Sequence, residues 1–144
     1  MKQETKYFGV MDYEEDEIIT FPEGLFGFES ETKYLLIRFN DEDDTLLCLQ
    51  SLTTPQLAFV VVNPFRLMPE YAPYVADADL EFLNVNNQEL VAIYAIAVVG
   101  DTTEQTSINL KAPLVIVPES HIGRQVILDD AQYSFRHVFV PKQQ

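Results

Sequence analysis

The chain contains no tryptophan, only five glycines and a single cysteine, Cys48. One cysteine cannot form an internal disulfide, so a hydrophobic core must hold the fold, and a reducing compartment suits such a chain. No basic N-terminal segment precedes an apolar run, and no apolar run is long enough to cross a bilayer. We therefore expect a cytoplasmic protein without a membrane segment, folded as one domain over residues 1–144.

Basic residues are also scarce, with 9 lysines and arginines against 23 acidic residues and a net charge of -14. Between Phe39 and Leu110 the only basic residue is Arg66. Such a surface repels phosphate backbones, so we expect no direct nucleic-acid binding, whereas a basic protein partner fits it. Simple solubility is the alternative explanation. The acids that we single out as electrostatic candidates are Asp41, Glu42, Asp43, Asp44, Asp77, Asp79 and Glu81.

The chain lacks the motifs of common enzymes and metal sites. There is no nucleophile elbow, dinucleotide-binding loop or phosphate-binding loop. The two histidines, His121 and His137, have no cysteine or histidine at metal-ligand spacing. The acidic runs at residues 14–17 and 41–44 lack the alternating ligands and central glycine of a calcium loop. We predict that the protein is not an enzyme and needs no metal or cofactor.

Hydrophobic residues alternate with a period of two, and β-branched and aromatic residues are enriched, which is typical of strands. One segment, residues 77–84, predicts a short helix, with Asp77 as its N-cap and with Leu80 and Leu83 facing inward. Many short strands with frequent turns predict an all-β fold, a small antiparallel β-barrel-like domain with one short helix. The predicted strands are residues 3–8, 18–21, 33–39, 46–52, 57–62, 90–99, 106–111, 114–117 and 126–128.

The most informative segment runs from Ile19 to Glu29. Pro22 ends a strand at Phe21, and Gly24 and Gly27 provide positions where φ can be positive. The apolar side chains of this loop must either fold back onto the body or form an adhesive surface. We favour packing, at a corner of the barrel.

Three apolar stretches need cover. Residues 58–62 and 90–99 are apolar on both strand faces, so each requires cover on both sides. For residues 58–62 the second cover is either a neighbouring loop or helix, or another protein. Near the C-terminus, Tyr133, Phe135, His137 and Phe139 share one face of an extended segment, where packing on the barrel is favoured over a docking edge.

Several segments, in this order along nearly the whole chain, resemble the FliW family of bacterial flagellar assembly factors. Two positions depart from the family pattern, Phe26 and Val138, where relatives often carry proline. The segments are Thr5-Lys6-Tyr7-Phe8-Gly9, Ile19-Thr20-Phe21-Pro22-Glu23-Gly24-Leu25-Phe26-Gly27-Phe28, Leu57-Ala58-Phe59-Val60-Val61-Val62-Asn63-Pro64-Phe65, Asn109-Leu110-Lys111-Ala112-Pro113-Leu114-Val115, Gly123-Arg124-Gln125-Val126-Ile127-Leu128 and Tyr133-Ser134-Phe135-Arg136-His137.

The resemblance implies a cytoplasmic β-barrel protein that binds two partners, flagellin and the RNA-binding translational repressor CsrA. It implies that binding to CsrA relieves repression of flagellin translation without occupying the RNA site, while free flagellin competes for the factor. The charge of -14 suggests one physical route, because an acidic body docked on the repressor repels phosphates. Allostery through the repressor dimer is another route.

We expect the partner contact where the apolar strand leads into a proline-fixed exit, and burial of its residues would argue against them. A small-ligand module, with aromatic residues lining a barrel mouth, is the alternative function. A weak hydrolase built on scattered carboxylates and His137 is a third hypothesis. The candidate contact residues are Phe59, Val61, Asn63, Pro64, Phe65 and Tyr71.

Overall fold

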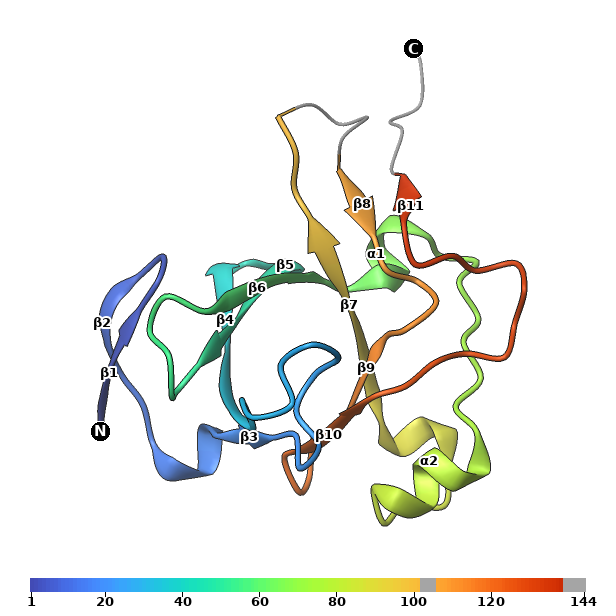
Figure 1. Cartoon of the computed structure of the whole chain (residues 1–144), viewed down its shortest axis with the longest axis horizontal. Helices are drawn as coiled ribbons and strands as arrows, with labels where there is room; N and C mark the ends of the chain where they lie inside the picture. Colours follow the sequence, from blue (N-terminus) through green and yellow to red (C-terminus); the bar gives the residue numbers. More distant parts are fainter. Residues whose placement is uncertain (102–105, 139–144) are drawn as a thin grey trace.

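The computed structural model describes residues 1–101 and 106–138. Strands form two sheets, a hairpin at the N-terminus and a large sheet that closes on itself (Figure 1). The strands are β1 (Lys2–Thr5), β2 (Gly9–Asp12), β3 (Ile19–Thr20), β4 (Lys33–Asn40), β5 (Asp43–Ser51), β6 (Ala58–Val62), β7 (Ala92–Val98), β8 (Ser107–Ile108), β9 (Leu114–Val117), β10 (Ile122–Gln125) and β11 (His137–Val138).

Closure of the large sheet makes a seven-stranded barrel in the order β7-β6-β5-β4-β3-β10-β9. The closing pairs join β7 to β9 and include Ile93 with Val115. Every pairing in this ring is antiparallel except that of β3 with β10. Strands β8 and β11 continue the sheet beyond β7. The predicted β-barrel is confirmed, with one parallel pair that the sequence did not indicate.

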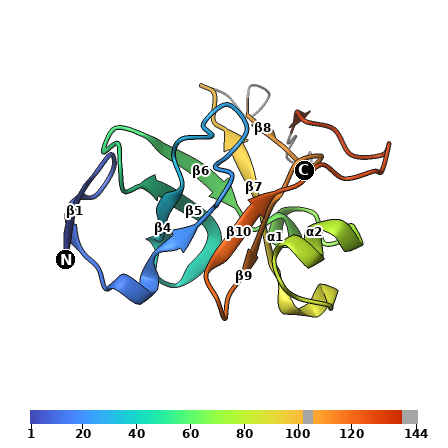
Figure 2. The same cartoon turned by 60° about the horizontal axis from the view of Figure 1, so that its bottom comes forward.

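Short helices lie outside the barrel wall (Figures 1 and 2). Helix α2 (Asp77–Phe82) confirms the predicted helix, and Leu80 and Leu83 are buried as expected. Its N-cap is Ala76, so the prediction of Asp77 as the cap is wrong, since Asp77 already lies in the first turn. Helix α1 (Pro64–Leu67) was not predicted, and two 3-10 turns, η1 (Glu15–Glu17) and η2 (Gln88–Leu90), complete the set in the described residues.

Two hydrophobic clusters cover the two faces of the apolar strands. Inside the barrel, Phe59 and Val61 pack with Tyr34, Leu49 and Leu114. On the outer face of β6 and β7, Val62, Ala95 and Ala97 pack with residues from α2 and the C-terminal segments, including Leu80 and Tyr133. The chain therefore supplies both covers of residues 58–62, and no partner protein is needed for this purpose.

The loop at residues 21–29 lies within the outline of the ring of strands in Figure 1. The side chains of Phe21 and Leu25 are buried in the interior cluster, where the ring of Phe21 meets that of Tyr34 edge-on at 5.6 Å. At Gly24, φ is +66° and a Cβ would lie 2.5 Å from the carbonyl oxygen of Phe28. Only glycine fits that corner. The predicted packing of the loop holds for Leu25, but not for Phe26 and Phe28, which are 51% and 39% exposed.

Strand β10 shows why one predicted strand was misplaced. From the sequence, glycine predicts a break at Gly123 before the expected strand 126–128, yet Gly123 lies inside β10, where a Cβ would meet the Phe21 ring at 2.7 Å. Residues 126–128 form no regular strand, because their neighbour Pro113 has no N–H to continue the ladder. Val126 and Leu128 still donate backbone hydrogen bonds, to Pro113 and Lys111. At the N-terminus the predicted strand 3–8 ends at Thr5, and Gly9 begins β2.

Substituting Gly123 by alanine tests the packing of Phe21. At a site without a steric conflict, Gly→Ala in a strand stabilises by about 0.4–1 kcal/mol. Here we expect a loss of about 1–3 kcal/mol, because the added methyl group overlaps the aromatic ring. The measurement is urea unfolding of the single variant and of the double variant with Phe21→Leu. A Gly123→Ala variant that is more stable than the parent would show that the Phe21 ring does not press on β10. The same would follow if the losses of stability from Gly123→Ala and Phe21→Leu were additive in the double variant.

Candidate functional site

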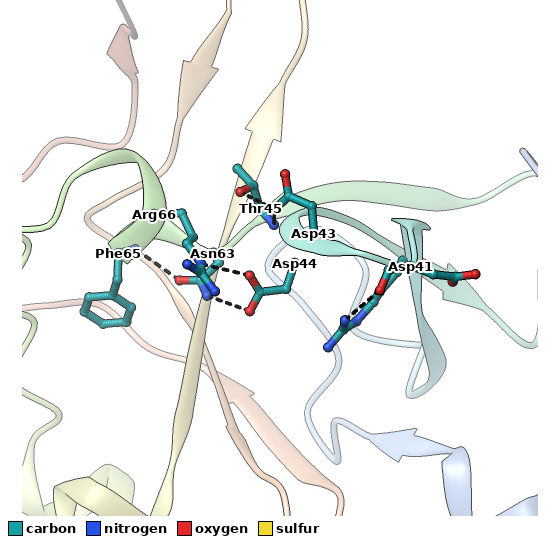
Figure 3. Close-up of polar contacts among 8 residues, drawn as sticks. Asp41, Asp43, Asp44, Thr45, Asn63, Phe65 and Arg66 are labelled. Carbon is teal, nitrogen blue, oxygen red and sulfur yellow. Dashed lines mark hydrogen bonds and ion pairs between the residues drawn. The ribbon is translucent and has the colours of Figure 1, made fainter.

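Helix α1 begins at the end of β6 for local reasons that the sequence encodes. Pro64 occupies the first turn, where its missing N–H costs nothing, and Asn63 is the N-cap. The side-chain oxygen of Asn63 accepts a hydrogen bond of 3.2 Å from the backbone N–H of Phe65. The chain thus turns sharply out of the barrel and presents the Phe65 ring at the surface (Figure 3).

Asp44 fastens this helix to the turn between β4 and β5 (Figure 3). Its carboxylate accepts hydrogen bonds from Asn63 Nδ2 at 3.3 Å and from Arg66 Nε at 2.9 Å. Partial burial opposes its ionisation, but the bonds from Arg66 and Asn63 prevail and hold the pKa of Asp44 below its ordinary value. Asp44 therefore acts as a structural anchor for α1.

A groove of about 400 Å³ runs beside α1. We call it the α1 groove. Its wall at Tyr71 is rigid, because the Tyr71 hydroxyl donates to the Leu110 carbonyl at 2.8 Å and the ring lies 4.8 Å from that of Tyr133. Phe65 packs on the same ring at 5.6 Å. The lining residues are Asn63, Phe65, Tyr71, Ala72, Pro73, Gln88, Val91, Ala92, Ile93 and Tyr94.

The groove unites three of the six candidate contact residues, Asn63, Phe65 and Tyr71. Tyr71 is only 3% exposed, and two others, Val61 and Pro64, are fully buried, which argues against these three as surface contacts. Phe59 is half-buried inside the barrel and touches Phe28, away from α1. Phe59 and Val61 both face the barrel interior, because side chains two positions apart point to the same side of strand β6.

The electrostatic candidates fall into two separate groups. Asp41, Glu42 and Asp43 are exposed at the β4–β5 turn, next to Asp44, and Thr45 holds the pKa of Asp43 below its ordinary value by hydrogen bonding. The other group belongs to α2. Asp77 and Glu81 line a second groove, of about 630 Å³, which we call the α2 groove.

Asp79 differs from the other acids of α2 because it pairs with a cation. It faces Arg124, whose guanidinium also reaches Glu23 at 3.1 Å and lies 4.1 Å from the centre of the Phe82 ring. This contact ties α2 to β10 and to the loop at residues 21–29. The sequence offered no signal for it, because the three elements are distant along the chain.

Several residues of the α1 groove escaped the sequence analysis. Gln88 exchanges two hydrogen bonds with the backbone of Val75, at 2.7 and 3.0 Å, and so holds the groove wall. Nothing in the sequence distinguishes Gln88 from other exposed glutamines. Arg66 was detectable, since it is the only basic residue in the acidic middle of the chain and follows the Asn63-Pro64 cap signal.

Two alternative functions, a small-ligand module and a weak hydrolase, require a cavity or a cluster of titratable groups. Side chains fill the barrel interior, and a depression of about 270 Å³ remains at its edge, between Ile19, Leu36 and Ile116. The residues that line either groove include no histidine, and His137 lies on β11 at the sheet edge.

Within residues 1–101 and 106–138, no group of three potential metal ligands comes together. In the same residues, no helix is long and apolar enough to span a bilayer.

Comparisons with known proteins identify the family. The family model described as FliW protein matches residues 2–139. The chain belongs to the FliW family. The flagellar assembly factor FliW of Geobacillus kaustophilus is 37% identical over 142 residues, covering 99% of this chain and 97% of the relative. That of Ruminiclostridium cellulolyticum is 35% identical over 144 residues, covering 100% and 97%.

A solved structure of a FliW protein agrees with the fold. The crystal structure of the flagellar assembly factor FliW superposes with a TM-score of 0.89 at 35% identity, and 98% of each chain is covered. The family that the sequence segments indicated is therefore confirmed. The barrel and the two grooves can be considered in the context of flagellar assembly.

The anchoring of α1 predicts a pH dependence. Because the pKa of Asp44 is lowered in the folded state, its contribution to stability is present above the ordinary aspartate pKa and is lost as the pH falls through the lowered value. We expect the Asn63 side-chain amide resonances to shift with a midpoint below 3.8, the ordinary value. The Asp44→Asn variant serves as the control and should show no such transition. A midpoint at or above the ordinary value would contradict the anchor.

Proposed function

We propose that this FliW-family protein is a cytoplasmic flagellar assembly factor that binds flagellin and a CsrA-type translational repressor. Binding to the repressor relieves repression of flagellin translation without blocking the RNA site directly. The observation that carries this proposal is the match of residues 2–139 to the FliW family together with near-complete coverage of relatives named flagellar assembly factors.

The α1 groove supports a role in protein recognition. It offers the exposed Phe65 ring beside a tyrosine that is fixed by a hydrogen bond, which is the rigid aromatic type of anchor that interface hot spots favour. In Figure 3, Asp41, Asp43 and Asp44 lie on the side of Arg66 that is away from Phe65. A basic partner with an apolar anchor fits this combination.

The charge distribution supports the non-competitive mode. A body of net charge -14 bound to a basic RNA-binding dimer raises the cost of bringing phosphates close to it. The protein need not cover the RNA site to act in this way. Free flagellin, by occupying the factor, restores repression, so the flagellin level controls its own synthesis. The same contact between the factor and free flagellin would also serve a chaperone action on flagellin.

The decisive experiment mixes the purified protein with the repressor and with flagellin, separately and together. We expect a defined complex with each, and displacement of the repressor by flagellin. Calorimetry and size-exclusion chromatography give the affinity and stoichiometry. Failure to bind either protein would overturn the assignment of function.

Substitution of Phe65 locates the contact. We expect Phe65→Ser to weaken binding of at least one partner by about tenfold or more, as loss of a central aromatic anchor does. The matched control is Phe135→Ser, since Phe65 and Phe135 are 40% and 52% exposed. A larger loss with the control would place the contact on the C-terminal aromatic segment, whose Phe139 lies outside the described residues.

A further inference from the structure

The α2 groove is the larger of the two grooves, and its walls come from three parts of the chain. The lining residues come from helix α2, from residues 84–90 and from the turn between β9 and β10. Figures 1 and 2 both place this turn beside α2 at the same end of the barrel. The volume is about 630 Å³, which accommodates several side chains of a partner.

Three apolar residues, Leu80, Val85 and Leu90, lie among the residues that line the groove, together with Asn84 and Asn86. Leu80 is buried and anchored in the outer hydrophobic cluster, and Val85 packs against the same cluster. Leu90, by contrast, is 46% exposed and has no comparable cover. An apolar side chain of a partner that enters the groove would therefore bury Leu90 against a preformed surface, which is favourable without reorganisation of the protein.

The rim of the groove is acidic from both sides. Asp77 and Glu81 are one helical turn apart on α2, and Glu119 approaches from the β9–β10 turn. No ion pair joins any of these three carboxylates to a lysine or arginine in the described part of the chain, unlike Asp79, which pairs with Arg124. Residues 77–90 contain no basic residue at all.

The charge and shape of the groove select the kind of ligand. The three carboxylates do not converge as metal ligands, because no group of three potential metal ligands occurs among residues 1–101 and 106–138. They line the groove together with Leu80, Val85 and Leu90. We propose that the α2 groove is a docking site for a basic peptide segment of a protein partner, one that inserts an aliphatic or aromatic side chain over Leu90 between lysines or arginines.

This inference rests on the proposed function and deepens it, because it adds a second recognition surface that is separate from the α1 groove. With two surfaces, two partners could bind at different places. The lining residues of the two grooves do not overlap. Simultaneous binding, rather than strict competition, is then possible for any partner pair that uses one groove each. The choice between competition and a ternary complex depends on which groove each partner occupies.

The test uses the full chain and three synthetic peptides. The first has a leucine flanked by lysines in a glutamine-alanine background, the second has the lysines replaced by glutamate, and the third has the leucine replaced by glutamine. We expect measurable binding of the first peptide only, weakened by added salt. Backbone amide shifts should centre on Leu80, Val85 and Leu90.

Two matched pairs of variants complete the test. Combined Asp77→Asn, Glu81→Gln and Glu119→Gln should weaken binding about tenfold, whereas Glu4→Gln, Glu15→Gln and Asp16→Asn remove the same charge elsewhere and should change it less than about twofold. Leu90→Asn should weaken binding, and Ile127→Asn, at another exposed apolar position, should not.

Two outcomes would overturn the inference. One is an equal loss with the control charge variants, and the other is a set of amide shifts centred outside the groove. Purified repressor and flagellin are measured with the same variants. If the partners bind and the α2 variants change the binding of neither one, the groove fails while the proposed function stands. If neither partner binds but the first peptide does, the groove stands and the proposed function fails.

Discussion

The packing of the Phe21 ring on the bare backbone of Gly123 is the constraint on which the rest of the structure depends. Strands β3 and β10 are joined by a parallel pairing of a single residue pair, so side-chain packing must hold this part of the ring. Phe21 supplies it, because the ring meets β10 on one side and Tyr34 of β4 on another. In the loop that follows Phe21, Glu23 forms an ion pair with Arg124. Arg124 also pairs with Asp79, so this contact connects the loop to α2.

The same logic explains where the functional surfaces lie. Strand β7 pairs with β6, β8 and β9 at different parts of its length, and the two hydrophobic clusters cover its two faces. The two proposed recognition surfaces lie outside the barrel wall, beside the short helices. Each has an exposed apolar side chain, Phe65 at the α1 groove and Leu90 at the α2 groove. Acids accompany both, which would suit binding to basic protein surfaces.

The fold was largely predictable because it depends on local signals, namely the period-two patterns, the Pro22-Glu23-Gly24 corner and the helix periodicity of residues 77–84. The errors arise where distant residues decide. Gly123 reads as a breaker in the sequence, and only the Phe21 ring explains why a strand needs it. Val61 reads as a candidate contact, yet strand alternation within a closed barrel buries it. Of the site, Asn63, Phe65 and Tyr71 were found through the cap and the apolar strand. Gln88, Glu119 and Arg124 were not, since their roles come from partners far away in sequence.

The central claim is that an acidic barrel opposes RNA binding through its charge while it is docked on the repressor. The most direct measurement is RNA release from the repressor by a variant whose exposed acids are neutralised but whose structural carboxylates, Asp44 and Asp79, are kept. The account predicts that, at concentrations that saturate the repressor with each variant, this variant releases less RNA, whereas a control with equal charge removed elsewhere releases as much as the parent. Full release by the neutralised variant, at the same saturation of the repressor, would contradict the account. The neutralised residues are Asp41, Glu42, Asp77 and Glu81, and the control residues are Glu4, Glu15, Asp16 and Asp129.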